Sequence, residues 1–327
     1  MIPILLSNSH MFNFNDYIRK FQRLHVDRSK GIAPHKPILL ISVFDEMDAG
    51  RITENRICIT PELVATFKEN WFNLVDSRIF QPKFALPFYH LKTDKFWHLI
   101  KFPGQEIALT SSNSIRSFTA LKISVDYAQF DEDLFLYAIE PKNRVLFRTV
   151  LLETYFPIDK EKYAREKAGQ NNYIVEIEEK LLTESPDQYR AEIANADEEE
   201  IYVRGGIFKK LVPRIYNYTC SISSLRINSA IGAQMIDACH IIPFSESHDD
   251  TISNGISLCP NLHRAFDRGL ISIDDEYRVL VSNNFVENTT EYSLKQLAGR
   301  KIVLPQQENQ LPSRDGIALH REKWNFV

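Results

Sequence analysis

Apolar residues in the first half of the chain recur at the spacing of amphipathic helices. The first such run covers residues 13–28. The second, from Ile38 to Met47, is apolar on all sides and predicts a buried helix that ends at Gly50. A third helix is predicted over residues 61–71. This pattern predicts a helix-rich N-terminal domain.

Two further segments of this half carry strand-like patterns. The stretch from Leu86 to Ile100 alternates around a polar turn at residues 93–95 and predicts a small β-hairpin. Between residues 118 and 156 the apolar spacing is mostly helical, but the group from Leu121 to Tyr127 fits either a helix or a short strand.

The C-terminal half predicts the order strand, loop, strand, helix. Alternating residues form a first strand that ends before Pro243, because a proline cannot donate to a sheet ladder. The polar run 244–253 predicts an exposed loop, and Asn254-Gly255 predicts a tight turn. Residues 256–259 form the second strand, and Gly269 closes a short helix.

A change in composition separates the two halves. Residues 157–200 are rich in charge and poor in large apolar side chains, which predicts a charged helical linker. We therefore divide the chain into an N-terminal domain (1–156), this linker and a C-terminal domain (201–327). The length of 327 residues is enough for two hydrophobic cores, and we expect the α+β fold class.

Composition also limits location and partners. The formal net charge is −4, so contacts with nucleic acid would come from local basic patches. Four cysteines do not make a disulfide framework, which favours a reducing, cytoplasmic location. The N-terminal residues lack the basic region of a signal peptide, and no apolar run approaches the ~20 residues of a membrane span. We expect no membrane partner.

Three polar residues of the C-terminal domain stand at a regular spacing: His240, Asn254 fourteen residues later, and His263 nine residues after that. His263 and Asp267 are four apart on the predicted helix and so share one face. Hydrolysis of a phosphodiester needs a divalent cation and a base, and imidazole and carboxylate suit Mg, Mn, Ni, Co or Zn. We assign His240 as general base and His263 with Asp267 as metal ligands.

These residues resemble the core of the HNH, or ββα-metal, nuclease family. The matching motifs are ACHIIP, NGISL and LHRAFDRG, and the resemblance covers about 125 residues from Tyr202 onward. It implies a catalytic set of His240, Asn254 and His263, in which Asn254 orients His240 or steadies the loop through backbone hydrogen bonds. Many members carry Asp or His just before the catalytic His. This chain has Cys239 there, so Cys239 or Asp237 is a candidate ligand beside Asp267.

Many members of this family also hold a structural zinc ion with two C-x-x-C pairs. Here Cys220 is followed three residues later by Ser223, and Cys259 by Leu262. Half of each pair is missing, so we expect no structural zinc.

A second group of candidates lies at the start of the buried N-terminal helix. Pro34 and Pro37 bracket His35 and Lys36. A helix start offers unpaired amides and partial positive charge, so these residues, with Arg28 upstream, predict an anion site.

The same pattern, followed by a Leu-Pro-Phe segment, resembles the sulfur-binding domain of bacterial restriction enzymes that recognise phosphorothioated DNA. The resemblance covers about 110 residues. It implies that cationic groups hold the modified phosphate and that the sulfur rests in an apolar cup at a proline. Lys36 replaces an arginine common in that family, which exchanges a bidentate grip for a point charge, and Leu86 replaces an aromatic residue. The residues that it assigns to DNA binding are Arg28, His35, Lys36, Leu86, Pro87 and Phe88.

An apolar cup beside cationic donors can prefer sulfur to oxygen, because sulfur is larger and accepts hydrogen bonds more weakly. The preference available is on the order of a few kcal/mol. The simpler interpretation is that the prolines only shape a helix start and that residues 86–91 form a core strand.

The sequence thus predicts a DNA endonuclease that recognises phosphorothioated double-stranded DNA and cuts nearby in host-defence restriction. An HNH site cuts one strand at a time, so cutting both strands calls for a homodimer or two separate nicks. Three alternatives stay open. The N-terminal domain could read another modification or an unmodified sequence, the HNH fold could be an inactive DNA-binding module, or the nuclease could be RNA-directed or toxin-like.

Overall fold

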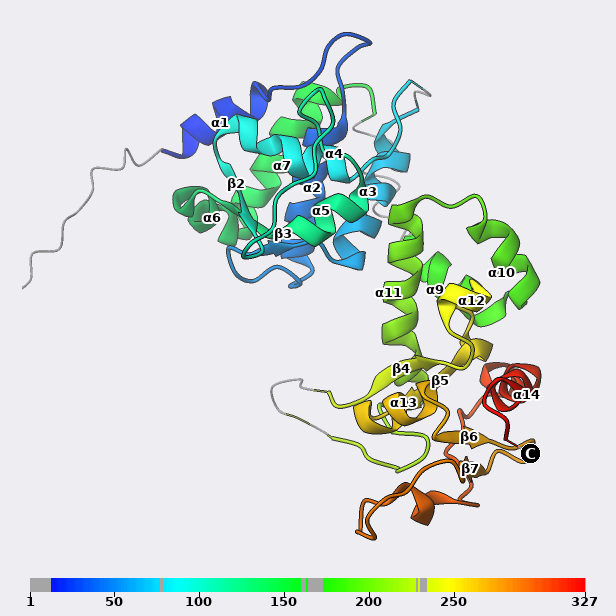
Figure 1. The fold of residues 1–327 in the computed structure, drawn as a ribbon. Coiled ribbons are helices and arrows are strands. Elements are labelled where there is room, and N and C mark those ends of the chain that lie inside the picture. The colour runs from blue at the N-terminus through cyan, green and yellow to red at the C-terminus, as the bar shows by residue number, and fades with distance from the viewer. Residues whose placement is uncertain are drawn as a thin grey trace, which may run out of the picture. The chain divides into compact units, whose positions relative to one another are not determined.

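The computed structural model describes residues 13–76, 79–159, 163, 173–227, 229 and 234–326. The chain forms two compact units, Met1–Tyr173 and Ile174–Val327 (Figure 1). The N-terminal residues considered for a signal peptide lie outside the described residues, as does much of the charged segment between 160 and 172. Within the part of the chain that the structure describes, no helix combines the length and apolar character needed to cross a bilayer.

The first unit is built around one buried helix, α2. Its side chains from Ile38 to Ile41 are fully buried, so α2 is apolar on all sides and has to be surrounded by other elements. It contacts α3, α4 and α7. The helices of this unit are α1 Phe14–Gln22, α2 His35–Asp48, α3 Pro61–Leu74, α4 Ala85–His90, α5 Phe118–Ser124, α6 Glu132–Ile139 and α7 Pro141–Tyr155, with the 3₁₀ turn η1 Leu91–Asp94.

A small antiparallel sheet with strand order β1-β3-β2 completes this unit. Its strands are β1 Ile57–Cys58, β2 Trp97–Lys101 and β3 Val125–Phe130. The group from Leu121 to Tyr127, for which helix and strand both stayed open, is divided between the two: its first part lies in α5, and β3 begins at Val125. The expected pairing of β2 with the preceding segment is wrong, because β2 pairs with β3, from Trp97 opposite Phe130 to Lys101 opposite Val125.

The segment expected as the first hairpin strand is the helix α4. Pro87 lies in its first turn, where a missing amide hydrogen breaks no helical bond. Phe88 is fully buried, and its carbonyl accepts a hydrogen bond from the indole N–H of Trp97 at 2.9 Å. A helical turn buries Phe88 against the core and still lets the chain reach β2.

The second unit begins with three helices, α9 Tyr173–Thr183, α10 Pro186–Ile193 and α11 Glu198–Ile215. Helices α9 and α10 lie in the segment expected to be a linker, but each has a buried apolar side. Ile177, Leu181, Tyr189 and Ile193 are all buried. The boundary between the compact units thus falls before these helices rather than after them.

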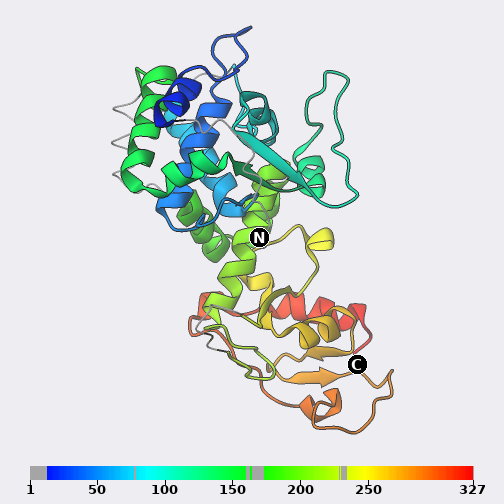
Figure 2. The same ribbon diagram turned by 90° about the vertical axis from the view of Figure 1, so that its left-hand side faces the viewer.

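The strand, strand, helix order that the sequence predicts is present. The remaining elements of this unit are β4 Asp237–His240, α12 Phe244–Ser247, η2 Ile252–Asn254, β5 Gly255–Leu258, α13 Pro260–Asp267, β6 Ile271–Ile273, β7 Val279–Val281, η3 Leu294–Leu297, η4 Glu308–Gln310 and α14 Arg314–Lys323. β4 and β5 are antiparallel, and α13 contacts both of them. Figure 2 shows the orange β6–β7 pair close to the red helix α14, which contacts β6.

Two local predictions for this region are wrong. Residues 244–253 do not form an exposed loop, because Asp249, Asp250 and Thr251 are buried. The dipeptide Asn254-Gly255 is not a tight hairpin turn either. Asn254 ends the 3₁₀ turn η2, and Gly255 is the first residue of β5, opposite His240. The glycine is needed for close packing, since a Cβ at this position would lie 2.7 Å from Val212 Cγ2 of α11.

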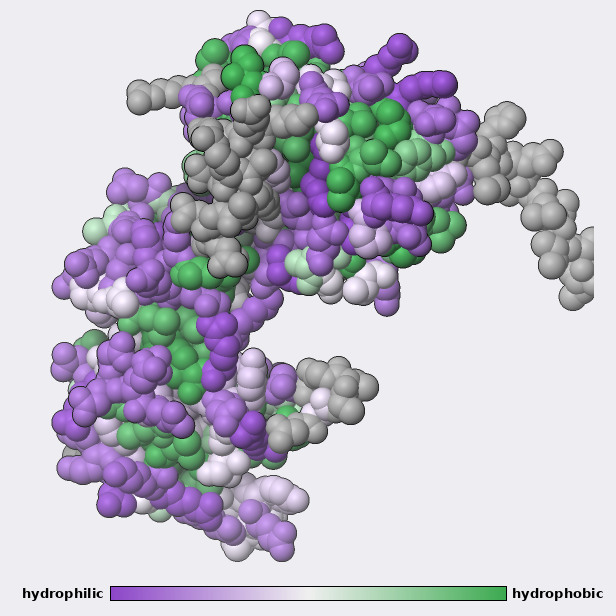
Figure 3. Space-filling model, turned by 180° about the vertical axis from the view of Figure 1, so that it is seen from behind, coloured by the Kyte–Doolittle hydropathy of each residue, from purple (hydrophilic) through white to green (hydrophobic). Residues whose placement is uncertain are grey.

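The fold class is α+β with a helix-rich first unit and a ββα element in the second, as the sequence predicts. On the face drawn in Figure 3, hydrophilic residues cover much of the surface and apolar residues form separate patches.

Gly255→Ala should destabilise the second unit by about 1–3 kcal/mol, because the added methyl group overpacks the contact between β5 and α11. Urea denaturation followed by circular dichroism measures the change. Gly316→Ala is the matched control, since its Cβ would be no closer than 3.5 Å to any neighbour. Equal stability of Gly255→Ala and the wild type would contradict the close packing.

Helix α14 is anchored on α13 by one buried imidazole. The ring of His320 stacks on Phe266 with centroids 3.8 Å apart. Its Nε2 lies 3.1 Å from the Phe266 carbonyl oxygen, and its Nδ1 lies 2.9 Å from the Ser272 hydroxyl. A neutral imidazole supplies the one donor and one acceptor that these contacts need. Burial lowers the pKa of His320 to about 4.

Acid should remove the contribution of His320. The unfolded imidazole, with an ordinary pKa of about 6.5, binds a proton more readily than the folded one, so the stabilisation is complete above about pH 6.5. It is lost as the pH falls towards 4, by up to about 3 kcal/mol. The difference in free energy of unfolding between the wild type and His320→Gln should therefore shrink over this window in urea titrations. A difference independent of pH would contradict a buried neutral ring.

Candidate functional site

The alternation of strand β4 divides the candidate residues between two faces. Successive side chains of a strand point in opposite directions, so Asp237 and Cys239 share one face and His240 lies on the other. The first face meets α13, and the second meets α11.

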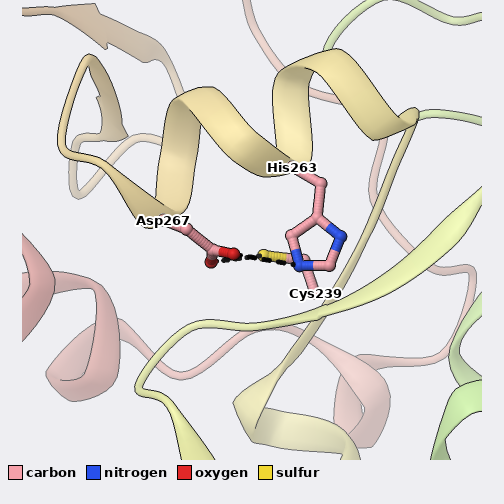
Figure 4. A group of neighbouring side chains, drawn as sticks. All are labelled: Cys239, His263 and Asp267. Atoms are coloured by element: carbon pink, nitrogen blue, oxygen red, sulfur yellow. Dashed lines mark hydrogen bonds and ion pairs between the residues drawn. The ribbon is translucent and has the colours of Figure 1, made fainter. Parts of the chain in front are cut away.

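On the α13 side, Cys239, His263 and Asp267 form a cluster with ligand atoms all within 4.8 Å of one another. Figure 4 shows the Cys239 sulfur below α13, between the ring of His263 and the carboxylate of Asp267. His263 Nε2 lies 3.4 Å from Asp267 Oδ2, and the Cys239 thiol lies 3.8 Å from Asp267 Oδ1. Among the described residues this is the one group of three or more His, Cys, Asp or Glu side chains with metal-binding spacing.

Asp237 lies at the edge of the same cluster, with its Oδ2 3.3 Å from His263 Nδ1. Both residues suggested from the sequence as the further ligand, Cys239 and Asp237, are thus close to His263 and Asp267. Cys239 is fully buried, and this burial, together with the nearby Asp267 carboxylate, raises the pKa of its thiol. A metal-free thiol at this position therefore stays protonated.

The ring of His240 lies on the α11 side of β4. It stacks on Phe208 of α11 with centroids 4.1 Å apart and planes 11° from parallel. Its Nε2 lies 2.7 Å from Asp250 Oδ1. The side chain is 20% exposed, which leaves part of the ring open to a substrate or water.

Asn254 braces the backbone that follows His240. Its side-chain oxygen accepts from the Ile242 N–H at 2.9 Å, and its amide donates to the Ile242 and Asp249 carbonyl oxygens, each at 2.9 Å. Its own carbonyl accepts from the Ile241 N–H at 2.8 Å. These contacts hold the backbone between Ile241 and Asp249 in place.

Sequence reasoning missed Asp250. This residue is 2% exposed and lies in the run taken for a surface loop. A pair of aspartates in a polar run is usually solvated, so no periodic signal marked it. Tyr189, whose hydroxyl donates to Asp250 Oδ2 at 3.1 Å, lies far upstream in α10 and could not be connected to this region from sequence spacing.

The two cysteines that remain of the expected C-x-x-C zinc motifs, Cys220 and Cys259, lie next to each other. Cys220 and Cys259 share a side-chain hydrogen bond, which lowers the pKa of Cys220. The Ser223 amide donates to Cys220 Sγ at 3.4 Å. Ser223 and Leu262 supply no thiolate, so the absence of structural zinc stays a prediction.

In the first unit, four of the six residues predicted to bind DNA line one cavity of about 840 Å³: His35, Lys36, Leu86 and Pro87. Sequence reasoning did not identify Phe80 and His90, which also line it. Phe88 is not among the lining residues, because it packs in the core against Phe84 and Trp97. Arg28 is exposed but lies outside the lining.

The two basic side chains at the start of α2 are already engaged. His35 Nε2 is 2.9 Å from the Gln81 carbonyl oxygen, and its ring lies 4.7 Å from that of Trp71. Lys36 donates to Asp94 at 2.7 Å and to Thr93 at 2.9 Å. Burial lowers the pKa of both His35 and Lys36.

Residues 220–274 match a protein-family model described as HNH endonuclease. This range holds both strands of the ββα element, the α13 helix and all the metal-cluster residues. The second unit therefore contains an HNH endonuclease domain. No curated protein matches the sequence significantly.

Three solved structures are partly similar to the chain. The modification-dependent TagI restriction endonuclease is 23% identical over 37% of this chain and 38% of its own, with a TM-score of 0.28. The sulfur-binding and SRA domains of ScoMcrA, complexed with phosphorothioated DNA, are 17% identical over 45% and 46%, with a TM-score of 0.35. The type IV phosphorothioation-dependent restriction endonuclease ScoMcrA is 11% identical over 76% and 94%, with a TM-score of 0.35. The chain thus spans less than half of the length of the first two.

His263→Ala and Asp267→Asn should each weaken binding of Mn²⁺ by at least about tenfold, because each removes a donor from the cluster. Isothermal titration calorimetry on the full chain measures the affinity. Glu276→Gln, which removes an exposed carboxylate of the same unit, is the control. Unchanged affinity in both cluster variants would place the metal elsewhere.

Proposed function

We propose that this protein is a modification-dependent DNA endonuclease. Its second unit hydrolyses phosphodiester bonds with a divalent metal, and its first unit recognises a phosphorothioate linkage. The observation that carries the proposal is the cluster of Cys239, His263 and Asp267 beside a strand that ends in His240. It lies within the matched HNH endonuclease range.

The donor set of the cluster fits a divalent metal. The imidazole is a borderline donor, the carboxylate a hard one and the thiolate a soft one. This mixed set suits Zn, Co, Ni or Mn, and the exposed carboxylates of Asp237 and Asp267 also admit Mg. When bound, the ion would stabilise negative charge on the phosphate and activate water.

The residues of the chain would do the rest of the chemistry. His240 would take the proton from the attacking water through its open ring nitrogen. Phe208 fixes the plane of that ring by stacking, and Asn254 fixes the backbone on its C-terminal side. The base is thus held rigidly at the end of β4 while part of its ring stays accessible.

The sulfur proposal is supported by the meeting of cationic and apolar groups in one cavity. Leu86 and Pro87 supply apolar wall, and His35 and Lys36 lie in the same lining. Contact with such a wall is favourable for a sulfur atom, because sulfur is weakly hydrated. Where few hydrogen-bond donors are free, sulfur also loses less solvation free energy than oxygen does on entering the cavity.

A second candidate is a reader of another DNA modification. It is favoured by the ion pair between Lys36 and Asp94, which neutralises the lysine expected to hold the phosphate. A cavity of about 840 Å³ also lies within the range of pockets for small organic groups.

Matched plasmids with and without phosphorothioation separate the two candidates. We expect the full chain with Mn²⁺ to cut the modified plasmid at least about tenfold faster, as a preference of a few kcal/mol allows. Equal cutting of both plasmids would reject the sulfur proposal and leave the nuclease. An RNA digest tests the substrate class in the same buffer.

His35→Ala and Pro87→Ala should weaken binding to phosphorothioated duplex by about tenfold or more and leave Mn²⁺ binding unchanged, because both residues line the cavity of the first unit. Gel shifts with duplexes that differ by one sulfur atom measure the affinity. His98→Ala is the control, since His98 is half exposed and does not line this cavity. Wild-type affinity in both cavity variants would move the recognition site elsewhere.

The inactive-module alternative has its own test. His240→Ala should abolish cleavage and keep DNA binding, whereas an inactive module would show no cleavage in the wild type either.

The oligomeric state bears on double-strand cutting. Light scattering of the DNA complex would show whether two copies of the chain assemble.

A further inference from the structure

A buried carboxylate connects the proposed general base to a helix far upstream. Asp250 Oδ1 lies 2.7 Å from His240 Nε2, and Asp250 Oδ2 lies 3.1 Å from the Tyr189 hydroxyl, which donates to it. The three residues come from β4, from the segment before η2, and from α10. Asp250 is 2% exposed and Tyr189 is fully buried.

A carboxylate at this depth has to be paired, because an unpaired buried charge is very unfavourable. The hydrogen bonds found for the Asp250 side chain are those to His240 and Tyr189. Tyr189 is itself held, since the guanidinium of Arg204 lies 5.2 Å from the centre of its ring. Arg204 is fixed in turn by Glu192 at 2.7 Å and Glu200 at 3.0 Å.

The contact also selects a tautomer. A carboxylate accepts hydrogen bonds, so the proton of a neutral His240 ring resides on Nε2. The lone pair is then on Nδ1, which is the atom available to take a proton from water. Stacking on Phe208 fixes the plane of the ring, and Asp250 fixes its rotation within that plane.

We infer that Asp250 is a positioning residue for the nuclease reaction, which sets the tautomer and orientation of His240, and that Tyr189 holds Asp250 in place. Helix α10 is then part of the catalytic unit rather than part of a passive connector. The inference rests on the proposed role of His240 as general base.

Asp250→Asn tests this directly, because the amide keeps the shape of the side chain but removes the charge and changes its hydrogen bonding. We expect kcat to fall at least about a hundredfold, the scale of general-base catalysis, while KM and Mn²⁺ affinity change by less than about threefold. Asp250→Glu should recover part of kcat. Tyr189→Phe should lower kcat by a smaller factor, since Asp250 keeps its contact with His240.

Asp274→Asn is the matched control for loss of a structural carboxylate. Asp274 Oδ1 accepts backbone N–H groups of Glu276 and Arg278 in the turn between β6 and β7, and an asparagine oxygen can accept the same bonds. Its kcat should stay within about threefold of the wild type. A wild-type kcat in Asp250→Asn would overturn the inference.

The tautomer can be read without any variant of Asp250, so a folding failure leaves the inference falsifiable. Nitrogen chemical shifts of the His240 ring at about pH 8, assigned by comparison with His240→Gln, should show Nε2 protonated and Nδ1 bare. The opposite tautomer would overturn the inference. Full cleavage by His240→Ala would instead overturn the base assignment beneath it.

Discussion

The site depends on the alternation of side chains along β4. Cys239 and His240 are neighbours in sequence, but a strand sends them to opposite faces. The thiol therefore joins the ligand cluster under α13, and the imidazole is directed to α11. A residue proposed as a metal ligand and one proposed as a base are thus adjacent in sequence and held by separate elements.

Because β4 presents a candidate site residue on each of its faces, the packing on both sides of the strand has to be rigid. On one side His320 holds α14 against α13 by stacking on Phe266 and by one hydrogen bond, and a second hydrogen bond joins it to Ser272 of β6. On the other side Gly255 lets α11 approach the β4–β5 pair closely. Between them, Asn254 satisfies the backbone groups of Ile242 and Asp249, so a buried polar network takes the place of an apolar core at this point.

The sequence is informative where the determinants are local. His263 and Asp267 share a face because they are four apart on one helix, and the strand and helix order from Met235 to Gly269 follows from short-range patterns. Prediction from the sequence misses contacts whose two partners lie far apart along the chain. Asp250 is buried because Tyr189 and His240 meet it, and β2 pairs with a strand that begins more than twenty residues later. Phe88 shows the same limit, since only the packed helix α4 shows that its ring belongs to the core.

The first unit shows how burial changes the meaning of a basic motif. The sequence suggests Lys36 as a phosphate contact, but Lys36 forms an ion pair with Asp94 that neutralises its charge. The same carboxylate lies 3.0 Å from His25 Nδ1. The deep part of the cavity therefore offers little free positive charge, and Coulomb attraction there does not distinguish sulfur from oxygen. Under the proposed sulfur recognition, selectivity would come from the apolar wall at Leu86 and Pro87, and attraction of the phosphate backbone would come from exposed lining residues such as Lys30. A weakly hydrated sulfur matches a wall of that kind better than a strongly hydrated oxygen does, because less solvation is lost when it enters.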